Sequence, residues 1–387
     1  MTEFNLDTEA LERHTEGARA ASGGAAEYWR AILDGDVVQP ESIASLWHSA
    51  IATDDFYELA RSRRAPRADH LETFSPLYMT NTCDAECLMC GMRRGNGALT
   101  RETAKVEEVV EQLNILVRRG MHAVALLTGE YRAVNRPWAM QYVNQALRAT
   151  QQLRFNHVLI NVGSIDEEEF DTLLAGVDRH ADDSLVRKVS MSTFQETYSR
   201  RVYAKFMGTD ADNPRADYDR RLKNFDRAWR AGMRVANPGI LVGLNPDVAF
   251  DLTGLVLHSR HLMDLGMEVY LSVPRLRRIA GSDGMRGIGD DEYVRLVALL
   301  ALALPQGKIV VTTRENAAMQ ARLAPIVSVI SAGSASVAPY TQAGARFPLE
   351  TSQFEVIDQR PFEAILQERL DEGVAIENFC PGETPAA

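Results

Sequence analysis

The amino-acid sequence predicts an α/β fold, a TIM-type barrel of eight parallel strands separated by helices, (β/α)8, with an N-terminal helical extension. Short apolar segments alternate with amphipathic ones beyond residue 70, and the apolar segments number eight. No phosphate-binding GxGxxG motif follows the first of them. The motif's absence disfavours a doubly wound open sheet, which is the alternative fold.

The first 70 residues are polar and read as helical. Ile43, Leu46, Trp47 and Ile51 recur at helical spacing, and this part of the chain has no strand signal. We therefore predict two parts, an N-terminal helical extension over residues 1–70 and a barrel with a C-terminal tail over residues 71–387.

The strands and helices of the barrel follow from hydrophobic periodicity. The predicted strands are residues 74–81, 122–129, 157–163, 188–195, 234–244, 267–274, 308–315 and 326–331. The predicted helices are residues 106–120, 137–153, 214–231, 248–265 and 290–303, with a short one after 315. Ser164 and Glu167 have the spacing of a capping box for the helix after the third strand. Pro238 and Gly239 are expected in the loop after the fifth strand, where they would shape a ligand site or a structural turn.

Composition indicates an ordinary globular protein, with 45% hydrophobic and 25% charged residues. The sequence contains no unbroken run of eighteen apolar residues, so it predicts no membrane span. The acidic, polar start lacks the features of a signal peptide. We expect a cytoplasmic protein without a membrane partner. The net charge of −11 and the scattered Lys and Arg residues weigh against nucleic-acid binding.

The segment TNTCDAECLMCGMRRGN holds three of the four cysteines, Cys83, Cys87 and Cys90, in a CxxxCxxC pattern after the first predicted strand. Three thiolates suit a [4Fe–4S] cluster whose fourth iron is open to another ligand, and S-adenosylmethionine (SAM) can provide that ligand. Two structural alternatives remain. The cysteines could pack as small apolar groups, or form a zinc site completed by Cys380 or His70.

This pattern resembles the radical SAM superfamily, and within it the aromatic amino acid lyase family. The tyrosine lyases of the ThiH/HydG type form the wider group, and the tryptophan lyases of the NosL type, which make 3-methyl-2-indolic acid, are the closer likeness. The segments that carry the resemblance run from residue 77 to 356: LYMTNTCDAECLMCGMRRGN, LLTGEY, FQETY, RRVYAKFMG, NPGILVGL, SVPRLR, TTRE and TSQFEV.

The resemblance implies cofactor contacts for residues at the ends of the first, second and fourth strands. Those residues are Met89, Gly129, Glu130, Gln195, Glu196 and Arg200. A carboxylate in TGE could meet the ammonium group of SAM, and a glycine permits close backbone approach. The structural alternatives are loop packing for the methionine, and turns or helix starts for the others.

The resemblance also implies substrate contacts. Arg314 would hold the substrate carboxylate, because a guanidinium can bind it through two parallel hydrogen bonds. Ser331 and Tyr78 would face the same substrate, and Arg275 is a second candidate anion partner. Surface salt bridges, a loop cap and a core tyrosine are the structural alternatives.

The implied reaction is that of a radical SAM carbon–carbon lyase acting on L-tryptophan, in thiopeptide antibiotic biosynthesis. A 5′-deoxyadenosyl radical takes a hydrogen from the substrate amino group, the Cα–carboxylate bond breaks, and the carboxyl fragment moves to the indole. A flavodoxin or ferredoxin would donate the electron. One alternative is a lyase of tyrosine or another aromatic amino acid that breaks Cα–Cβ. Another, of a different class, is a non-catalytic Fe–S or zinc protein.

Overall fold

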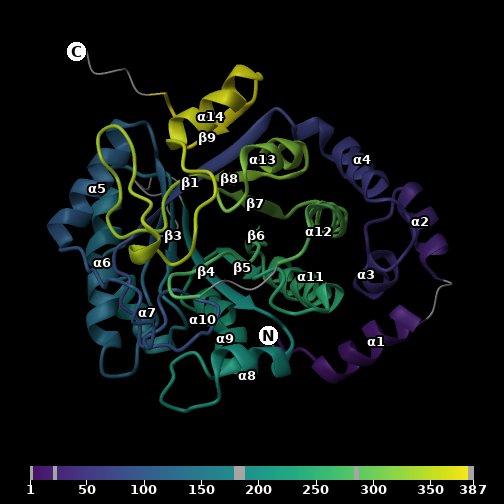
Figure 1. Cartoon of the computed structure of the whole chain (residues 1–387), viewed down its shortest axis with the longest axis horizontal. Coiled ribbons are helices and arrows are strands. Elements are labelled where there is room, and N and C mark those ends of the chain that lie inside the picture. The colour runs from purple at the N-terminus through teal and green to yellow at the C-terminus, as the bar shows by residue number, and fades with distance from the viewer. Residues whose placement is uncertain (1–2, 21–23, 178–187, 283–286, 382–387) are drawn as a thin grey trace.

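The computed structural model describes residues 3–20, 24–177, 188–282 and 287–381. Eight parallel strands close into a barrel, because β1 pairs with β2 on one side and with β8 on the other (Figure 1). The predicted barrel is thereby confirmed. Its strands are β1 (His70–Tyr78), β2 (Ala123–Leu127), β3 (His157–Asn161), β4 (Lys188–Glu196), β5 (Val235–Ile240), β6 (Glu268–Ser272), β7 (Lys308–Thr312) and β8 (Val329–Ser331).

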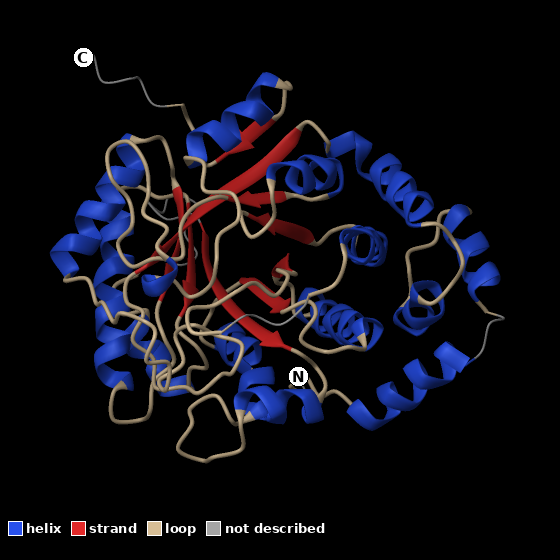
Figure 2. Cartoon of the chain, in the orientation of Figure 1, coloured by secondary structure: helices blue, strands red, loops and turns tan. Residues whose placement is uncertain are grey.

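Helices surround the strands (Figure 2). Those that follow the barrel strands are α5 (Val106–Arg118), α6 (Arg136–Gln152), α7 (Glu167–Leu173), α8 (Arg200–Met207), α9 (Tyr218–Leu222), α10 (Asn224–Arg230), α11 (Val248–Asp264), α12 (Asp290–Ala303) and α13 (Ala317–Leu323). Short 3-10 helices cover Ala65–Arg67, Ala324–Ile326 and Leu349–Thr351, and α14 (Phe362–Asp371) lies near the C-terminal end.

The hydrophobic core has two parts. A large layer lies between the strands and the helices, where α5 contributes Val109, Leu113 and Leu116, all fully buried. A smaller cluster joins residues of different strands, among them Phe74, Leu159 and Tyr270. Side chains thus fill the barrel interior below the mouth, as is usual for eight parallel strands.

The N-terminal helices α1 (Thr8–Ala20), α2 (Ala25–Leu33), α3 (Pro40–Trp47) and α4 (Thr53–Arg64) form an arc outside the barrel (Figure 1). Helix α3 contacts α11, and α4 contacts α12. Thr53 at the start of α4 donates a 2.8 Å hydrogen bond to Asp291, and Arg295 donates a 2.6 Å bond to the carbonyl of Leu46. The residues predicted as an extension therefore pack against the barrel helices, while the division into two parts stays a prediction.

The segment Asn237–Pro238–Gly239 is a correction to the expected loop, because it lies inside β5 and pairs with β4. A Cβ atom on Gly239 would lie 2.6 Å from the carbonyl oxygen of Ser272 and 2.7 Å from the Phe194 ring. Only glycine fits between these two neighbouring strands. The segment therefore allows close strand packing and does not form a turn.

Two helix predictions were also wrong. Helix α7 begins at Glu167, and its capping interaction joins Asp166 to Glu169 rather than Ser164 to Glu167. Ser164 cannot form the expected capping box because its backbone N–H, which would donate to the Glu167 side chain, donates to the carboxylate of Glu130 instead. The single helix expected over residues 214–231 is two helices, α9 and α10, which meet at Lys223.

A ninth strand, β9 (Ala375–Glu377), was not expected from the sequence. It runs parallel to the first three residues of β1, while β2 pairs only with Ser75–Tyr78. The start of β1 therefore extends beyond the barrel and gains a partner from the C-terminal end of the chain.

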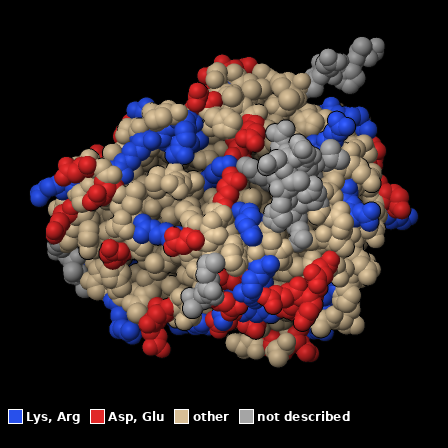
Figure 3. All heavy atoms as spheres, turned by 180° about the vertical axis from the view of Figure 1, so that it is seen from behind, with Lys and Arg blue, Asp and Glu red and all other residues tan. Residues whose placement is uncertain are grey.

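Acidic and basic side chains are interspersed over the face seen in Figure 3. Among the described residues, no helix is long and apolar enough to cross a membrane.

Candidate active site

The cysteine loop lies where the sequence places it, directly after β1. Cys83, Cys87 and Cys90 are free cysteines, and all three line one cavity at the carboxyl ends of the strands. Cys87 is buried and the other two are half-buried. Residues from distant parts of the chain meet them there. The predicted site residues that line this cavity are Tyr78, Cys83, Cys87, Met89, Cys90, Gly129, Glu130, Glu196, Arg314 and Ser331.

The TGE segment after β2 packs directly on the cysteine loop. The backbone N–H of Glu130 lies 3.3 Å from the Cys83 sulfur, and the N–H of Asp84 donates to the Glu130 carbonyl at 2.9 Å. A Cβ atom on Gly129 would lie 2.7 Å from the Cα of Cys83. A glycine is required here because the two backbones touch.

The three thiols share an environment that favours the neutral form. Burial raises the pKa of Cys83 to about 12, and it raises the pKa values of Cys87 and Cys90 as well. Thiolate ligands therefore need a strongly positive centre that displaces their protons, as metal binding does. Three thiols that line one cavity fit an iron–sulfur cluster with one open position.

The fold excludes a zinc site completed by His70 or Cys380. His70 is the first residue of β1, and its ring lies 3.4 Å from Glu377 on β9. The backbone N–H of Cys380 donates to the carbonyl of Gly120, just before β2. Both residues are therefore at the amino ends of the strands, and β1 alone separates His70 from the cysteine loop by about 26 Å.

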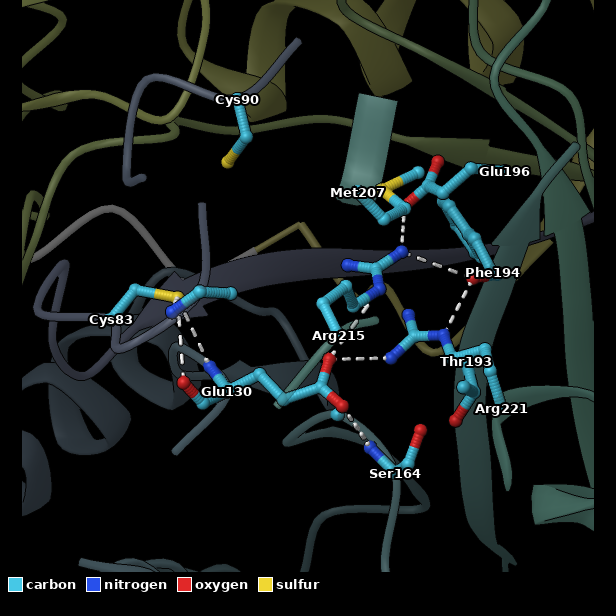
Figure 4. A network of polar contacts seen from close by, with 12 residues as sticks. Cys83, Cys90, Glu130, Ser164, Thr193, Phe194, Glu196, Met207, Arg215 and Arg221 are labelled. Carbon is cyan, nitrogen blue, oxygen red and sulfur yellow. Dashed lines mark hydrogen bonds and ion pairs between the residues drawn. The ribbon is translucent and has the colours of Figure 1, made fainter. Parts of the chain in front are cut away.

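The carboxylate of Glu130 already has protein partners. It accepts hydrogen bonds from the backbone N–H of Ser164 at 3.0 Å and from Arg221 at 2.8 Å, and Arg215 lies at 3.5 Å (Figure 4). Burial alone would raise the pKa of Glu130, but the two arginines outweigh it and lower the pKa. An incoming ammonium group would have to share this carboxylate with two guanidinium groups.

Arg215 connects two strand ends. It pairs with Glu196 at the end of β4, at 2.8 Å, as well as with Glu130 after β2. Burial would lower the pKa of Arg215, but its neighbours, with Cys87 the strongest, raise it well above the ordinary value. Glu196 has a φ of 69°, and the register of β4 against β5 shifts beside it. Such strain in a non-glycine residue is common at functional sites.

The arginines near the ends of β6 and β7 differ in their partners. Glu315 forms an ion pair with Arg275, whose Nε lies 3.0 Å away, and with Arg277 at 2.9 Å. Arg314 has no ion pair with a carboxylate among the described residues. Its guanidinium lies 3.3 Å from the centroid of the Phe354 ring. Its Nη1 also donates a 3.4 Å hydrogen bond to the carbonyl of Arg275, and Arg314 lines the cavity. Arg275 is held by Glu315 and does not line the cavity.

Ser331 and Tyr78 lie at the ends of β8 and β1, on the same cavity as Arg314. The Tyr78 hydroxyl donates a 2.6 Å hydrogen bond to the side-chain oxygen of Gln353. Burial raises the pKa of Tyr78, so this hydroxyl remains a donor at neutral pH.

Two predicted cofactor residues are not part of the cavity lining. Gln195 is buried, and its side-chain nitrogen has no hydrogen-bond partner among the described residues. Arg200 begins α8, pairs with Asp219 at 2.9 Å and lies over the Tyr218 ring at 4.2 Å. Their contacts to SAM stay predictions.

Several residues of the cavity were missed by the sequence analysis. Three are arginines in segments rich in arginine, one of them in SVPRLR, and two lie in the TSQFEV segment. Both segments carry the family resemblance, but the resemblance implied no role for these residues. They are Arg215, Arg221, Arg277, Gln353 and Phe354. A paired and an unpaired arginine look the same in a sequence, so no signal separated them.

Comparisons with known proteins agree with this geometry. The 2-iminoacetate synthase of Escherichia coli (strain K12) is 27% identical over 355 residues, which cover 88% of this chain and 86% of that protein. The [FeFe] hydrogenase maturase subunit HydE of Thermotoga maritima is 24% identical over 253 residues, 65% of each chain. The model of the Biotin and Thiamin Synthesis associated domain matches residues 272–375.

A crystal structure of HydG, a maturase of the [FeFe]-hydrogenase, superposes with a TM-score of 0.82 at 25% identity, covering 96% of this chain and 80% of that one. Methylornithine synthase (PylB) shares the fold, with a TM-score of 0.68 at 17% identity, covering 89% of this chain and 96% of that one. The chain is related to the ThiH/HydG type of radical SAM enzyme. Its class is that of the radical SAM carbon–carbon lyases, and its cofactors are a [4Fe–4S] cluster and SAM.

Proposed function

We propose that this chain is a radical SAM lyase of aromatic amino acids, that its substrate is L-tryptophan, and that its product is 3-methyl-2-indolic acid. One observation supports the assignment of an amino acid as the substrate. The guanidinium of Arg314, which has no carboxylate partner among the described residues, lies in the same cavity as the three cysteines. A guanidinium that lines a cavity without a carboxylate partner is a natural site for a substrate carboxylate.

Cys83, Cys87 and Cys90 would hold the cluster. SAM would lie beside them, against Met89, Gly129, Glu130 and the end of β4, where Gln195, Glu196 and Arg200 were predicted as contacts. When bound and reduced by one electron, from a donor such as flavodoxin or ferredoxin, this pair supplies a 5′-deoxyadenosyl radical.

The remaining work falls to the side chains of the substrate site. Arg314 would bind the carboxylate and so point the amino group of the substrate toward the cofactor side of the cavity. Ser331, next to it at the end of β8, would add a hydrogen bond, and Tyr78 would limit the space for the aromatic ring. Arg314 would also retain the carboxyl fragment after the Cα–carboxylate bond breaks. Positioning of this kind can account for several kcal/mol of a barrier, ~7 or more in well-oriented systems.

A second candidate is a tyrosine lyase that breaks the Cα–Cβ bond. The similarity to 2-iminoacetate synthase and to HydG favours it, and the same arginine would serve either substrate. The choice of tryptophan rests on the sequence likeness of CLMCGMRRGN and TGEY to the tryptophan lyases, as does the expected place in thiopeptide antibiotic biosynthesis. A non-catalytic Fe–S or zinc protein would have no use for an arginine that lines the cavity without a carboxylate partner.

The test is an anaerobic reaction of the reconstituted protein with SAM and dithionite, offered L-tryptophan or L-tyrosine in parallel. Mass spectrometry follows 5′-deoxyadenosine and the aromatic product. We expect 3-methyl-2-indolic acid from tryptophan. Formation of p-cresol from tyrosine would change the assigned substrate to tyrosine but leave the enzyme class unchanged. A fully loaded cluster that cleaves no SAM would overturn the proposal.

A further inference from the structure

The segment after β8 closes one side of the cavity over the cysteine loop. Three hydrogen bonds attach its backbone to that loop and to the residues just after it. One comes from the side-chain nitrogen of Asn81, which donates to the carbonyl of Thr351 at 3.0 Å. The N–H of Gly91 donates to the carbonyl of Gln353 at 3.0 Å, and the N–H of Thr100 donates to the carbonyl of Glu350 at 2.7 Å. A Cβ atom on Gly91 would lie 2.6 Å from the Gln353 carbonyl, so the two backbones are in direct contact. The segment is therefore held in place without any help from the Gln353 side chain.

The side-chain amide of Gln353 lies between a cluster cysteine and a substrate-side tyrosine. Its oxygen accepts the 2.6 Å hydrogen bond from the Tyr78 hydroxyl, and its nitrogen lies 3.4 Å from the sulfur of Cys90. Both Gln353 and Tyr78 line the cavity. No other residue described in this structure bonds to a cluster cysteine and to a predicted substrate residue through one side chain.

The chemistry of the two neighbours decides which way the amide faces. A tyrosine hydroxyl in this position donates to the amide oxygen, which leaves the NH₂ group toward Cys90. The reversed amide would set its oxygen against the sulfur. A cluster-bound cysteine is a thiolate without a proton, so that arrangement would bring two acceptors together. Only one orientation satisfies both ends.

We propose that Gln353 is a positioning residue that donates an N–H···S hydrogen bond to the Cys90 thiolate of the bound cluster, raises the reduction potential of that cluster, and holds the Tyr78 hydroxyl in place. Reduction adds one electron, and thus one negative charge, to the cluster. A donor aimed at a ligand sulfur stabilises that charge, and such hydrogen bonds are among the factors that set cluster potentials. The inference rests on the cluster of the proposed function, but not on its substrate.

The decisive measurement is the midpoint potential of the reconstituted cluster, followed by electron paramagnetic resonance during an anaerobic redox titration without SAM or amino acid. Gln353→Leu keeps the size of the side chain and removes the N–H. Gln353→Glu keeps its shape, offers no N–H when ionised and adds a negative charge. We expect both variants to have a more negative potential than the wild type, with Glu at least as far shifted as Leu.

Tyr78→Phe is the matched control, because it removes the other hydrogen bond of the same amide and leaves the N–H toward Cys90. Its potential should stay close to that of the wild type. Iron and labile sulfide are measured in every sample, so that only fully loaded protein is compared, and the Glu variant alone carries the test if the Leu variant does not load.

An unchanged potential in a loaded Gln353 variant would overturn the inference, and so would an equal shift in Tyr78→Phe. Because no substrate is present, a wrong substrate assignment leaves this test intact. Failure of the proposed function would instead appear as absent SAM cleavage in a wild-type protein whose cluster titrates normally.

Discussion

Replacing Arg314 by methionine tests the central assignment, because it removes the guanidinium and keeps much of the side-chain volume. In the wild type a substrate carboxylate would gain two charge-assisted hydrogen bonds in a largely buried site. Each is worth about 1.5–3 kcal/mol net. Arg314 is half-buried, so we take the lower limit for both bonds, about 3 kcal/mol. The affinity for L-tryptophan should fall roughly 150-fold.

The assay is equilibrium dialysis under anaerobic conditions, with the reconstituted protein and SAM but no reductant, so that binding is measured without turnover. Tryptamine, which has the indole and the amino group but no carboxylate, provides the internal comparison. Its affinity should change less than about 3-fold between the wild type and Arg314→Met, since the two proteins differ only at the carboxylate site.

Arg275→Lys is the matched protein control. Arg275 binds Glu315 and lies outside the cavity lining, so this variant should lower the thermal unfolding temperature and leave the affinity of the folded protein for tryptophan unchanged. An equal loss of tryptamine and tryptophan binding in Arg314→Met would refute the reasoning, because it would mean that Arg314 shapes the cavity. Unchanged tryptophan affinity would mean that another residue binds the substrate carboxylate, and Arg277, which also lines the cavity, is the next candidate.

Three further predictions concern the cluster and the core. Cys87→Ala should abolish iron and labile sulfide loading, whereas Cys380→Ala, at an exposed cysteine, should not change it. Gly129→Ala should cut loading severely in a folded protein, because its Cβ atom overlaps the cysteine loop; normal loading would contradict that packing argument. Burial raises the pKa of Asp251 to about 7, so its contribution to stability is full below about pH 4 and is lost as the pH rises through 7, about 4 kcal/mol in total. Urea unfolding at several pH values should show this slope in the wild type and not in Asp251→Asn; equal slopes would refute it.

Local spacing made some parts of the site readable from the sequence. The CxxxCxxC pattern predicted Cys83, Cys87 and Cys90 as a set of ligands because their spacing lies within one loop, and all three line one cavity. Arg314 and Ser331 could be placed because Ser331 ends β8 and Arg314 follows the end of β7 by two residues, and parallel strands of a barrel end at one mouth. Arg275 also follows a strand end, that of β6, and its ion pair with Glu315 distinguishes it from Arg314.

Other parts depended on contacts between distant residues. Glu130 and Arg221 are 91 positions apart, and no periodicity links them. The pairing of β9 with β1 joins the two ends of the barrel sequence, and the three residues of β9 are too short for a strand signal. The interior position of Pro238 in β5 was missed because proline and glycine together usually indicate a turn.

By itself, the sequence determined the barrel, the cysteine loop and the strand ends that surround it, because hydrophobic periodicity and ligand spacing are properties of neighbouring residues. The tertiary structure alone decided which charges neutralise one another and which remain available. Glu315 forms ion pairs with Arg275 and Arg277. Glu130 forms one with Arg221. Arg314 lines the cavity and has no carboxylate partner among the described residues. The physical reason is that a buried charge is stabilised by its nearest partner, and the fold selects that partner from the whole chain.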